Sequence, residues 1–144
     1  MNSLDTNILL YALNSGCPEH IPCRRLIDRA LSEKGRWIVA EQVWFELYRL
    51  LRNKAVLEKP LGPKHAADVI AWYRNRSGWL HGSWETDMME ELDKIWRGAR
   101  FPGRNGFDAV LAVTLKAHGV ATFYTRNVMD FSPFGFFTLI DPIT

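Results

Sequence analysis

The stretch FDAVLAVTLKAHGVATFYTRNVMDF, residues Phe107 to Phe131, is the part of the chain that decides the fold. Nearly every residue from Phe107 to Ala117 is apolar, which predicts a helix without a solvent face, buried on all sides. His118-Gly119 predicts the end of this helix, and ATFYT at residues 121–125 predicts a strand followed by a polar turn. A helix that leads directly into a strand is typical of an α/β fold.

The rest of the chain alternates between strands and helices in the same way. The remaining predicted elements are a strand ending at Asp5, helices over Thr6–Leu13 and Cys23–Lys34, a strand over Trp37–Ala40, helices over Glu41–Leu57 and Lys64–Arg76, a short strand within Gly78–Trp84, a helix over Glu85–Trp96 and a strand over Phe136–Ile140. This alternation predicts a three-layer α/β/α architecture around a mostly parallel sheet of about four to five strands. A single domain, residues 1–144, is expected for this length.

Composition narrows the class of protein but does not name a function. Hydrophobic residues make up 47% of the chain and charged residues 24%, values that are ordinary for a globular domain and that exclude disorder. A net charge of +2 is too small to indicate nucleic-acid binding by itself. No apolar run reaches membrane-spanning length and the start has no signal-peptide pattern, so we expect a cytoplasmic protein without a membrane partner.

The only two cysteines, Cys17 and Cys23, flank His20 in the sequence CPEHIPC. Three ligands with no evident fourth make a poor structural zinc site. A disulfide across this short loop is unfavourable in a reducing cytosol. We therefore expect two inert thiols.

Acidic residues follow or precede the predicted strands at several separate places. Asp5 ends the first strand, and Glu46 lies within about two turns of the start of the helix after the second strand. Asp108 begins the helix that leads into the strand at 121–125, and Asn127 and Asp130 follow that strand. Because functional residues of open α/β sheets gather at the carboxyl ends of the strands, these side chains are expected to meet in one crevice.

Carboxylates gathered in a partly buried crevice repel one another, which raises their pKa values unless a cation compensates. Oxygen ligands without a histidine or cysteine set favour Mg²⁺, with Mn²⁺ as a substitute. Such an ion polarises a phosphodiester and lowers the pKa of a bound water molecule, which then acts as the nucleophile. The acids Asp5, Glu46, Asp108 and Asp130 are thus candidates for both metal binding and catalysis.

Four segments in this order resemble the PIN domain family, and more narrowly the VapC-type ribonuclease toxins of bacterial toxin–antitoxin systems. They are LDTNILLYAL from Leu4, VWFELYRLLR from Val43, FDAVLAVTLKAHG from Phe107 and TRNVMDF from Thr125. The middle of the chain, from about Leu57 to Phe101, matches only in being helical. Each segment is weak alone, but the four together at this spacing are fairly specific.

The resemblance implies a metal-dependent endoribonuclease that cuts RNA, either tRNA or rRNA. It also implies a homodimer and a small VapB-like antitoxin whose C-terminal part covers the site. By their positions in the motifs, Asp5, Glu46 and Asp108 would bind the metal, and Thr6 and Asn7 would shape the turn between strand and helix.

One departure from the family pattern concerns the last motif. Many relatives have a fourth acid two residues after its threonine, where this chain has Asn127. Asp130 is expected to substitute, as an outer ligand or a ligand of a second metal. The departure favours one metal ion over two.

Each acid also has a purely structural interpretation. Asp5 suits a helix N-cap, a role compatible with metal binding. Asp108 suits the first turn of a helix, where the dipole favours an anion. Glu46 suits a surface ion pair with Arg49 three residues on, and Asp130 suits a turn. Glu46 borders an apolar stripe and not a polar face, which favours the ligand interpretation.

Arginines close to the acidic positions are expected to contact RNA phosphates. Arg104 precedes Asp108 and Arg126 precedes Asn127, and Arg49, Arg52, Arg97 and Arg100 lie nearby in the sequence. For any one of them, a solvated surface position is the simpler interpretation.

Two other classes of function stay open from the sequence. Asn127 is compatible with a catalytically weak PIN-fold module that binds RNA or protein. A phosphatase of the haloacid-dehalogenase type also starts from an aspartate at a strand end, but it needs a second acid two residues later, where this chain has Asn7. The ribonuclease hypothesis therefore ranks first and the phosphatase last.

Overall fold

The computed structural model describes residues 1–144, in which short strands alternate with helices. The elements are β1 (Asn2–Leu4), α1 (Thr6–Leu13), α2 (His20–Ser32), β2 (Ile38–Ala40), α3 (Glu41–Leu51), α4 (Pro63–Arg76), β3 (Leu80–Gly82), η1 (Thr86–Met88), α5 (Met89–Trp96), η2 (Gly103–Asn105), α6 (Gly106–Ala117), β4 (Thr122–Tyr124), α7 (Val128–Phe131), η3 (Ser132–Phe134) and β5 (Thr138–Ile140). The three η elements are single turns of 3₁₀ helix.

The strands form two parallel sheets, one of three strands in the order β1-β4-β5 and one of two strands, β2-β3. Hydrogen-bonded ladders join β2 to β3, β1 to β4 and β4 to β5, and each of these pairs is parallel. A parallel bridge between Asn2 and Trp37 joins the two halves, and the Asn2 N–H donates to the Arg36 carbonyl at 2.9 Å. The expected mostly parallel arrangement is confirmed, with the five strands divided between a three-stranded and a two-stranded sheet.

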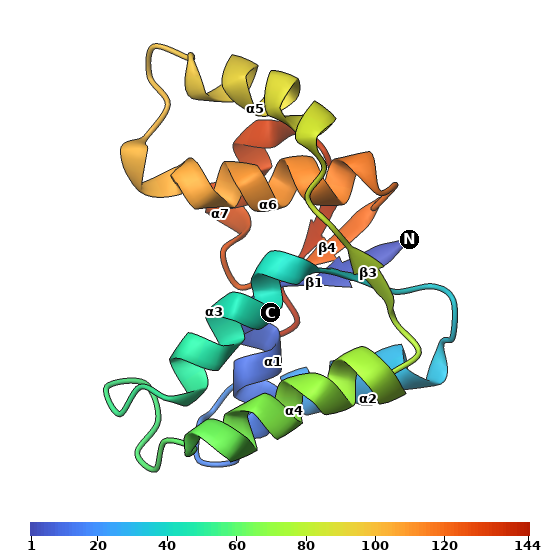
Figure 1. The fold of residues 1–144 in the computed structure, drawn as a ribbon, viewed down its shortest axis with the longest axis vertical. Coiled ribbons are helices and arrows are strands. Elements are labelled where there is room, and N and C mark those ends of the chain that lie inside the picture. Colours follow the sequence, from blue (N-terminus) through green and yellow to red (C-terminus); the bar gives the residue numbers. More distant parts are fainter.

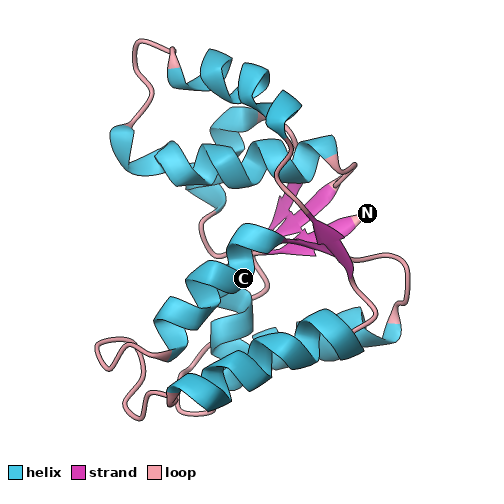
Figure 2. Ribbon diagram, viewed as in Figure 1, coloured by secondary structure: helices cyan, strands magenta, loops and turns pink.

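Helices cover both faces of this sheet. Figure 1 shows α1, α2, α3 and α4 on one side of the strands and α5, α6 and α7 on the other, and Figure 2 shows the strands between the two groups. This arrangement confirms the three-layer α/β/α architecture. None of the helices has the length and apolar character needed to cross a bilayer.

Two groups of buried side chains hold the layers together. The larger core includes Trp37, Phe123 and Phe131, all essentially inaccessible to solvent. A small second cluster, Met88, Leu92, Ala109 and Val113, joins η1 and α5 to α6. Burial of large apolar side chains is the main stabilising contribution in such a fold.

Helix α6 begins and ends close to its predicted positions. Gly119 follows it with φ of +80°, and the N–H groups of Gly119 and Val120 donate to the Lys116 and Leu115 carbonyls, both at 3.0 Å. This pattern of two bonds is the Schellman motif, which requires a left-handed residue and so favours glycine. The prediction of burial on all sides is wrong at the first turn, where Phe107 is 89% exposed.

Two other helix boundaries also differ from prediction. Helix α2 begins at His20 and not at Cys23, and α3 ends at Leu51 and not at Leu57. The Asn53 side chain accepts the Ala55 N–H at 2.9 Å, which closes a local turn that competes with helix continuation.

Candidate active site at the carboxyl edge of the sheet

The carboxyl ends of β1 and β4 lie side by side and place Asp5 next to Thr125. The Asp5 N–H donates to the Tyr124 carbonyl at 2.9 Å, which continues the ladder past the end of β1. From this point the chain enters α1 on one face of the sheet, whereas α7 follows β4 on the other face (Figure 1). Because the segments that follow these two neighbouring strands leave towards opposite faces of the sheet, a crevice opens between them. Such a crevice is the usual ligand site of an open α/β sheet.

Both carboxylate oxygens of Asp5 are held by neighbouring groups. Oδ1 accepts the Thr6 N–H at 2.8 Å, and Oδ2 accepts the Thr125 hydroxyl at 2.8 Å. The residue is only 7% exposed. Asp5 is therefore the N-cap of α1, as its structural interpretation predicted, and it also lines the cleft described next.

A cleft of about 530 Å³ lies at this edge of the sheet. Its walls come from the start of α1, from α3, from the first turns of α6 and from the segment after β4. The lining residues are Asp5, Thr6, Asn7, Gln42, Val43, Phe45, Glu46, Arg49, Phe107, Asp108, Val110, Leu111 and Asn127. The fold thus brings together in one cleft three of the four acids selected from the sequence.

Burial and mutual repulsion raise the pKa values of Asp5 and Asp108. Burial is the largest cause for Asp5 and raises its pKa to about 6, against the lowering effect of its Thr125 and Thr6 hydrogen bonds. Burial, followed by the charges of Asp130 and Asp5, raises the pKa of Asp108 to about 6. Carboxyl groups in these positions are poised to change protonation near neutral pH.

Glu46, on α3, interacts electrostatically with Asp5 and Asp108. The residue is exposed but lines the cleft, and partial burial is the main cause that raises its pKa. The neighbouring Arg49 lowers the pKa of Glu46, and Asp108 raises it. Glu46 also adds to the repulsion that raises the pKa of Asp5.

Asp130 lies on α7, at the border between this cleft and a neighbouring cavity. It lines the neighbouring cavity, yet its charge contributes to the raised pKa values of both Asp5 and Asp108. Asn127 lines the main cleft, and its backbone N–H donates to the Thr125 hydroxyl oxygen at 2.9 Å. The segment after β4 therefore contributes Asn127 to the main cleft and Asp130 to the neighbouring cavity.

The two arginines selected from the sequence lie outside the cleft lining. Arg126 forms an ion pair with Asp141, with Nη1 at 2.9 Å from Oδ2, and Arg104 is exposed on η2. Arg49 on α3 is instead the cation that lines the cleft.

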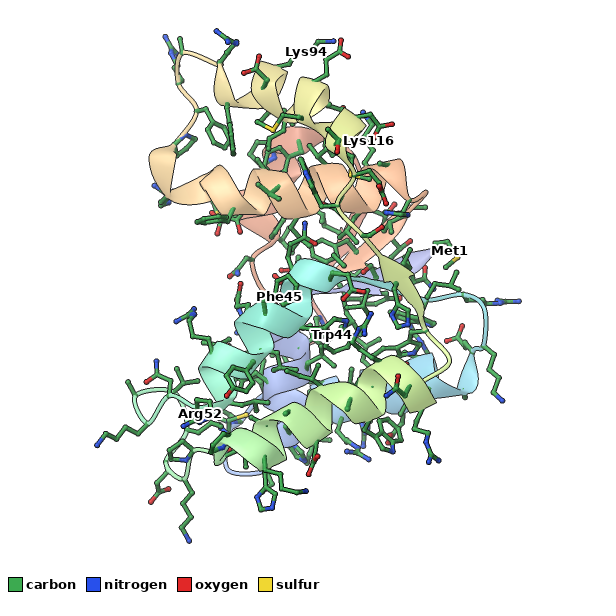
Figure 3. All side chains as sticks on the ribbon, viewed as in Figure 1. Met1, Trp44, Phe45, Arg52, Lys94 and Lys116 are labelled. Atoms are coloured by element: carbon green, nitrogen blue, oxygen red, sulfur yellow. The ribbon has the colours of Figure 1, made fainter.

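Several residues of this site were not predicted from the sequence. Thr125 is fully buried and holds Asp5, but an uncharged threonine in a strand gives no sign of that contact. Phe45 and Phe107, which immediately precede Glu46 and Asp108, line the cleft although they are 72% and 89% exposed. Figure 3 labels Phe45 on α3. The position of each phenylalanine directly before a candidate acid is the sequence feature that could have identified Phe45 and Phe107 as site residues.

The donor set fits a hard divalent cation, although the side chains are not closed around one point. No three His, Cys, Asp or Glu side chains lie close enough together to enclose a metal ion. Asp5, Glu46 and Asp108 all line the cleft, and all three offer only carboxylate oxygens, the ligands that Mg²⁺ and Mn²⁺ prefer.

The segment around Cys17 and Cys23 offers no such site. His20 Nδ1 lies 2.9 Å from the Tyr11 carbonyl, and burial raises the pKa of the Cys23 thiol to about 11. A thiol with so high a pKa is a poor ligand and a poor nucleophile.

The model of the PIN domain family matches residues 3–132. The chain belongs to the PIN domain family. Ribonuclease VapC24 of Mycobacterium tuberculosis is 41% identical to this PIN domain over 144 residues, which cover 100% of this chain and 98% of that protein. The resemblance to VapC-type toxins of toxin–antitoxin systems is thereby confirmed.

Solved structures share the fold at lower identity. The crystal structure of M. tuberculosis VapC20, described as a sarcin–ricin loop cleaving toxin, has a TM-score of 0.73 and 19% identity, covering 98% of this PIN domain and 100% of that chain. A toxin–antitoxin complex from Klebsiella pneumoniae has a TM-score of 0.63 and 15% identity, with coverage of 99% and 98%.

Proposed function

We propose that residues 1–144 act as a single domain that is a metal-dependent endoribonuclease. In this proposal Asp5, Glu46 and Asp108 hold Mg²⁺, or Mn²⁺ in its place, and Asp130 and Asn127 complete the surroundings of the ion. When bound, the ion would supply a water molecule of lowered pKa and would stabilise charge that develops on the phosphodiester.

The observation that carries the proposal is the convergence of Asp5, Glu46 and Asp108 in one cleft, with the pKa of each raised. Three acids face a single lining cation, Arg49. Such a cleft would repel an RNA phosphate unless a cation neutralised the acids first. Metal binding therefore explains both the clustering of the acids and the admission of an anionic substrate.

Other residues of the chain position the acids. Thr125 and the Thr6 N–H fix the orientation of Asp5, and each carboxylate oxygen keeps a further lone pair for a ligand. Asp108 lies in the first turn of α6, where the helix dipole favours its ionised form. Positioning of this kind is what tunes a metal site.

The rim of the cleft suits single-stranded RNA. We propose that Arg49 contacts a phosphate and that the exposed rings of Phe45 and Phe107 stack on unpaired bases. The names of VapC24 and VapC20, a ribonuclease and a sarcin–ricin loop cleaving toxin, support tRNA or rRNA as the substrate class.

Family membership also supports a cognate partner. The toxin–antitoxin complex among the structural relatives favours a small VapB-like antitoxin, and we propose a cytoplasmic homodimer as the form that it inhibits. An apolar groove between α2 and α4, lined by Ile27, Leu31, Val69 and Trp72, is available for an apolar segment of such a partner.

The decisive experiment is cleavage of total RNA by the purified protein with Mg²⁺, with EDTA, and with the variant Asp108→Asn. Asp68→Asn is the matched control, because Asp68 is an exposed acid on α4 that pairs only with Lys64. We expect discrete fragments that require the metal, persist in the control and disappear with Asp108→Asn. If the folded protein binds RNA or an antitoxin without any cleavage, the alternative of a catalytically weak binding module is correct, and Asn127 becomes its explanation.

A further inference from the structure

A second cavity of about 390 Å³ adjoins the acidic group on the side of Asp130. It lies between α5, the turn that precedes α6, and the segment from α7 to Phe136. Its walls are mainly apolar, with the rings of Phe101, Phe134 and Phe136, and Lys94 lies at its margin on α5 (Figure 3). Concave apolar sites of this size with a few polar groups are typical of small-ligand pockets.

Asn105 is the polar group that makes this cavity unusual. It occupies the N-cap position of α6, where an asparagine normally accepts a backbone N–H, yet its side chain makes no capping bond. The residue is only 7% exposed, its amide has no hydrogen-bond partner within the protein, and it lines the cavity. No hydrogen bond within the protein uses this amide, so its donor and its acceptor are free to pair with the polar edge of a ligand in the cavity.

The aromatic walls suit a flat ring. Phe134 and Phe136 are stacked with centroids 5.9 Å apart and an interplanar angle of 24°. Lys116 lies over Phe136 at 4.2 Å from the ring centroid and is held by Glu91 at 2.6 Å. These contacts order the aromatic wall, and an ordered aromatic wall is a stacking surface for a nucleobase.

Asp130 connects this cavity to the acidic cleft. It lines the cavity, while its charge raises the pKa values of Asp5 and Asp108. A nucleotide whose phosphate lies at the acids can therefore direct its neighbouring base into the cavity.

We propose that this cavity is a nucleobase subsite, which receives one unpaired base next to the scissile phosphate and reads its edge with the Asn105 amide. The inference rests on the proposed ribonuclease function. An asparagine amide offers both a donor and an acceptor, and it pairs best with adenine, which presents an amino donor beside a ring nitrogen acceptor. The subsite is therefore selective for adenine.

The first test is cleavage of a random-sequence RNA oligonucleotide pool by the Mg²⁺-loaded protein, with the cut sites read by sequencing. The native protein should cut preferentially where adenine occupies one fixed position beside the cut. Asn105→Ala should still cut, but with an adenine enrichment about tenfold lower, because a good bidentate contact discriminates between bases by about that factor. Asn75→Ala, an exposed asparagine on α4, keeps the full enrichment. Because Asn105 makes no capping bond, both variants should melt close to the native protein.

A second readout needs no catalysis. The protein is the Asp108→Asn variant, and the probe is a short RNA with 2-aminopurine in place of the adenine that enters the cavity. The fluorescence of 2-aminopurine should be quenched on binding, and the double variant with Asn105→Ala should bind the probe about tenfold more weakly. If no variant cleaves RNA, the proposed ribonuclease function fails, and this binding measurement still tests the cavity. Unchanged base enrichment and unchanged oligonucleotide affinity in Asn105→Ala would overturn the subsite. So would an equal loss of cleavage at all sequences, which indicates a structural role for Asn105 or a protein partner in the cavity.

Discussion

The Thr125 hydroxyl donates a hydrogen bond of 2.8 Å to Asp5 Oδ2, across 120 positions of sequence. The same hydroxyl oxygen accepts the Asn127 N–H at 2.9 Å, so one buried side chain joins the end of β1 to the turn after β4. This contact favours the ionised form of Asp5 and opposes the effect of its burial.

Thr125→Val tests this contact, because valine keeps the shape of threonine and removes the donor. We expect the free energy of unfolding to fall by about 1–3 kcal/mol and the Mg²⁺ affinity to fall about 10–100-fold, since a metal ligand would lose its orienting partner. Urea denaturation and the Mg²⁺ dependence of RNA cleavage measure the two effects. Thr125→Ser restores the donor and should recover most of both, and Thr138→Val on exposed β5 should change neither. Equal behaviour of the valine and serine variants would contradict the role of the hydroxyl.

The pH dependence of stability follows from the raised pKa values of Asp5 and Asp108, both about 6 in the folded protein against 3.8 ordinarily. Between these values the folded state binds more protons than the unfolded state. Stability is therefore greatest below the ordinary pKa and is lost as the pH rises through 6. We expect the metal-free protein to be on the order of 1–3 kcal/mol more stable at pH 5 than at pH 7.5, measured by urea denaturation in EDTA. Asp108→Asn should reduce this difference, and an unchanged difference would mean that other groups cause it.

Metal addition should reverse that dependence, because a bound cation favours the ionised carboxylates. Mg²⁺ is expected to raise the melting temperature more at pH 7.5 than at pH 5, and its binding should release protons. Calorimetry in two buffers of different ionisation enthalpy measures the release. Asp108→Asn should weaken the binding, whereas Asp68→Asn should leave it unchanged. Binding without proton release at pH 6 would show that Asp5 and Asp108 are not ligands.

Phe107→Ala separates RNA contact from folding, because the ring is 89% exposed. Stability should change by less than about 0.5 kcal/mol, and RNA binding should weaken by about 1–3 kcal/mol if the ring stacks on a base. Fluorescence anisotropy with a short single-stranded RNA measures the binding. Met129→Ala is the matched control, since Met129 is 87% exposed but does not line the cleft. An equal effect of both substitutions would exclude a specific contact at Phe107.

Arg49 and Arg126 are expected to behave differently when each is replaced by alanine. Arg49 lines the cleft, so its loss should weaken RNA binding and reduce the slope of log affinity against log salt by about 1. Arg126 pairs with Asp141, so its loss should lower thermal stability and leave the salt slope unchanged. The salt titration and a melting curve distinguish the two outcomes. A reduced salt slope for Arg126→Ala would show that Arg126 contacts RNA after all.

The alternation of elements and the acidic cleft could be predicted because both depend on local pattern. Strand ends are visible in the sequence, and parallel pairing brings the carboxyl ends of β1, β2 and β4 to one edge. That rule is enough to predict that Asp5, Glu46 and Asp108 lie together.

Contacts between distant segments could not be predicted in the same way. Arg126 stands next to a site residue in the sequence, but the pairing of β4 with β5 brings Asp141 to it and creates an ion pair instead. Thr125 and Asn105 are uncharged, and their importance depends on which partner is within reach of the side chain. Pairing across the sheet decides these roles, and residue type alone carries little information about it.

The pairing of β1 with β4 has a consequence for the order in which the protein is made. Asp5 is synthesised 120 residues before Thr125, the residue that orients it. A growing chain on the ribosome therefore carries the first acid without its partner, without Asp108 and without the neighbouring strand β4. The cleft is complete only when β4 has paired with β1, so under the proposed ribonuclease function a partly translated chain would lack the site that cuts RNA.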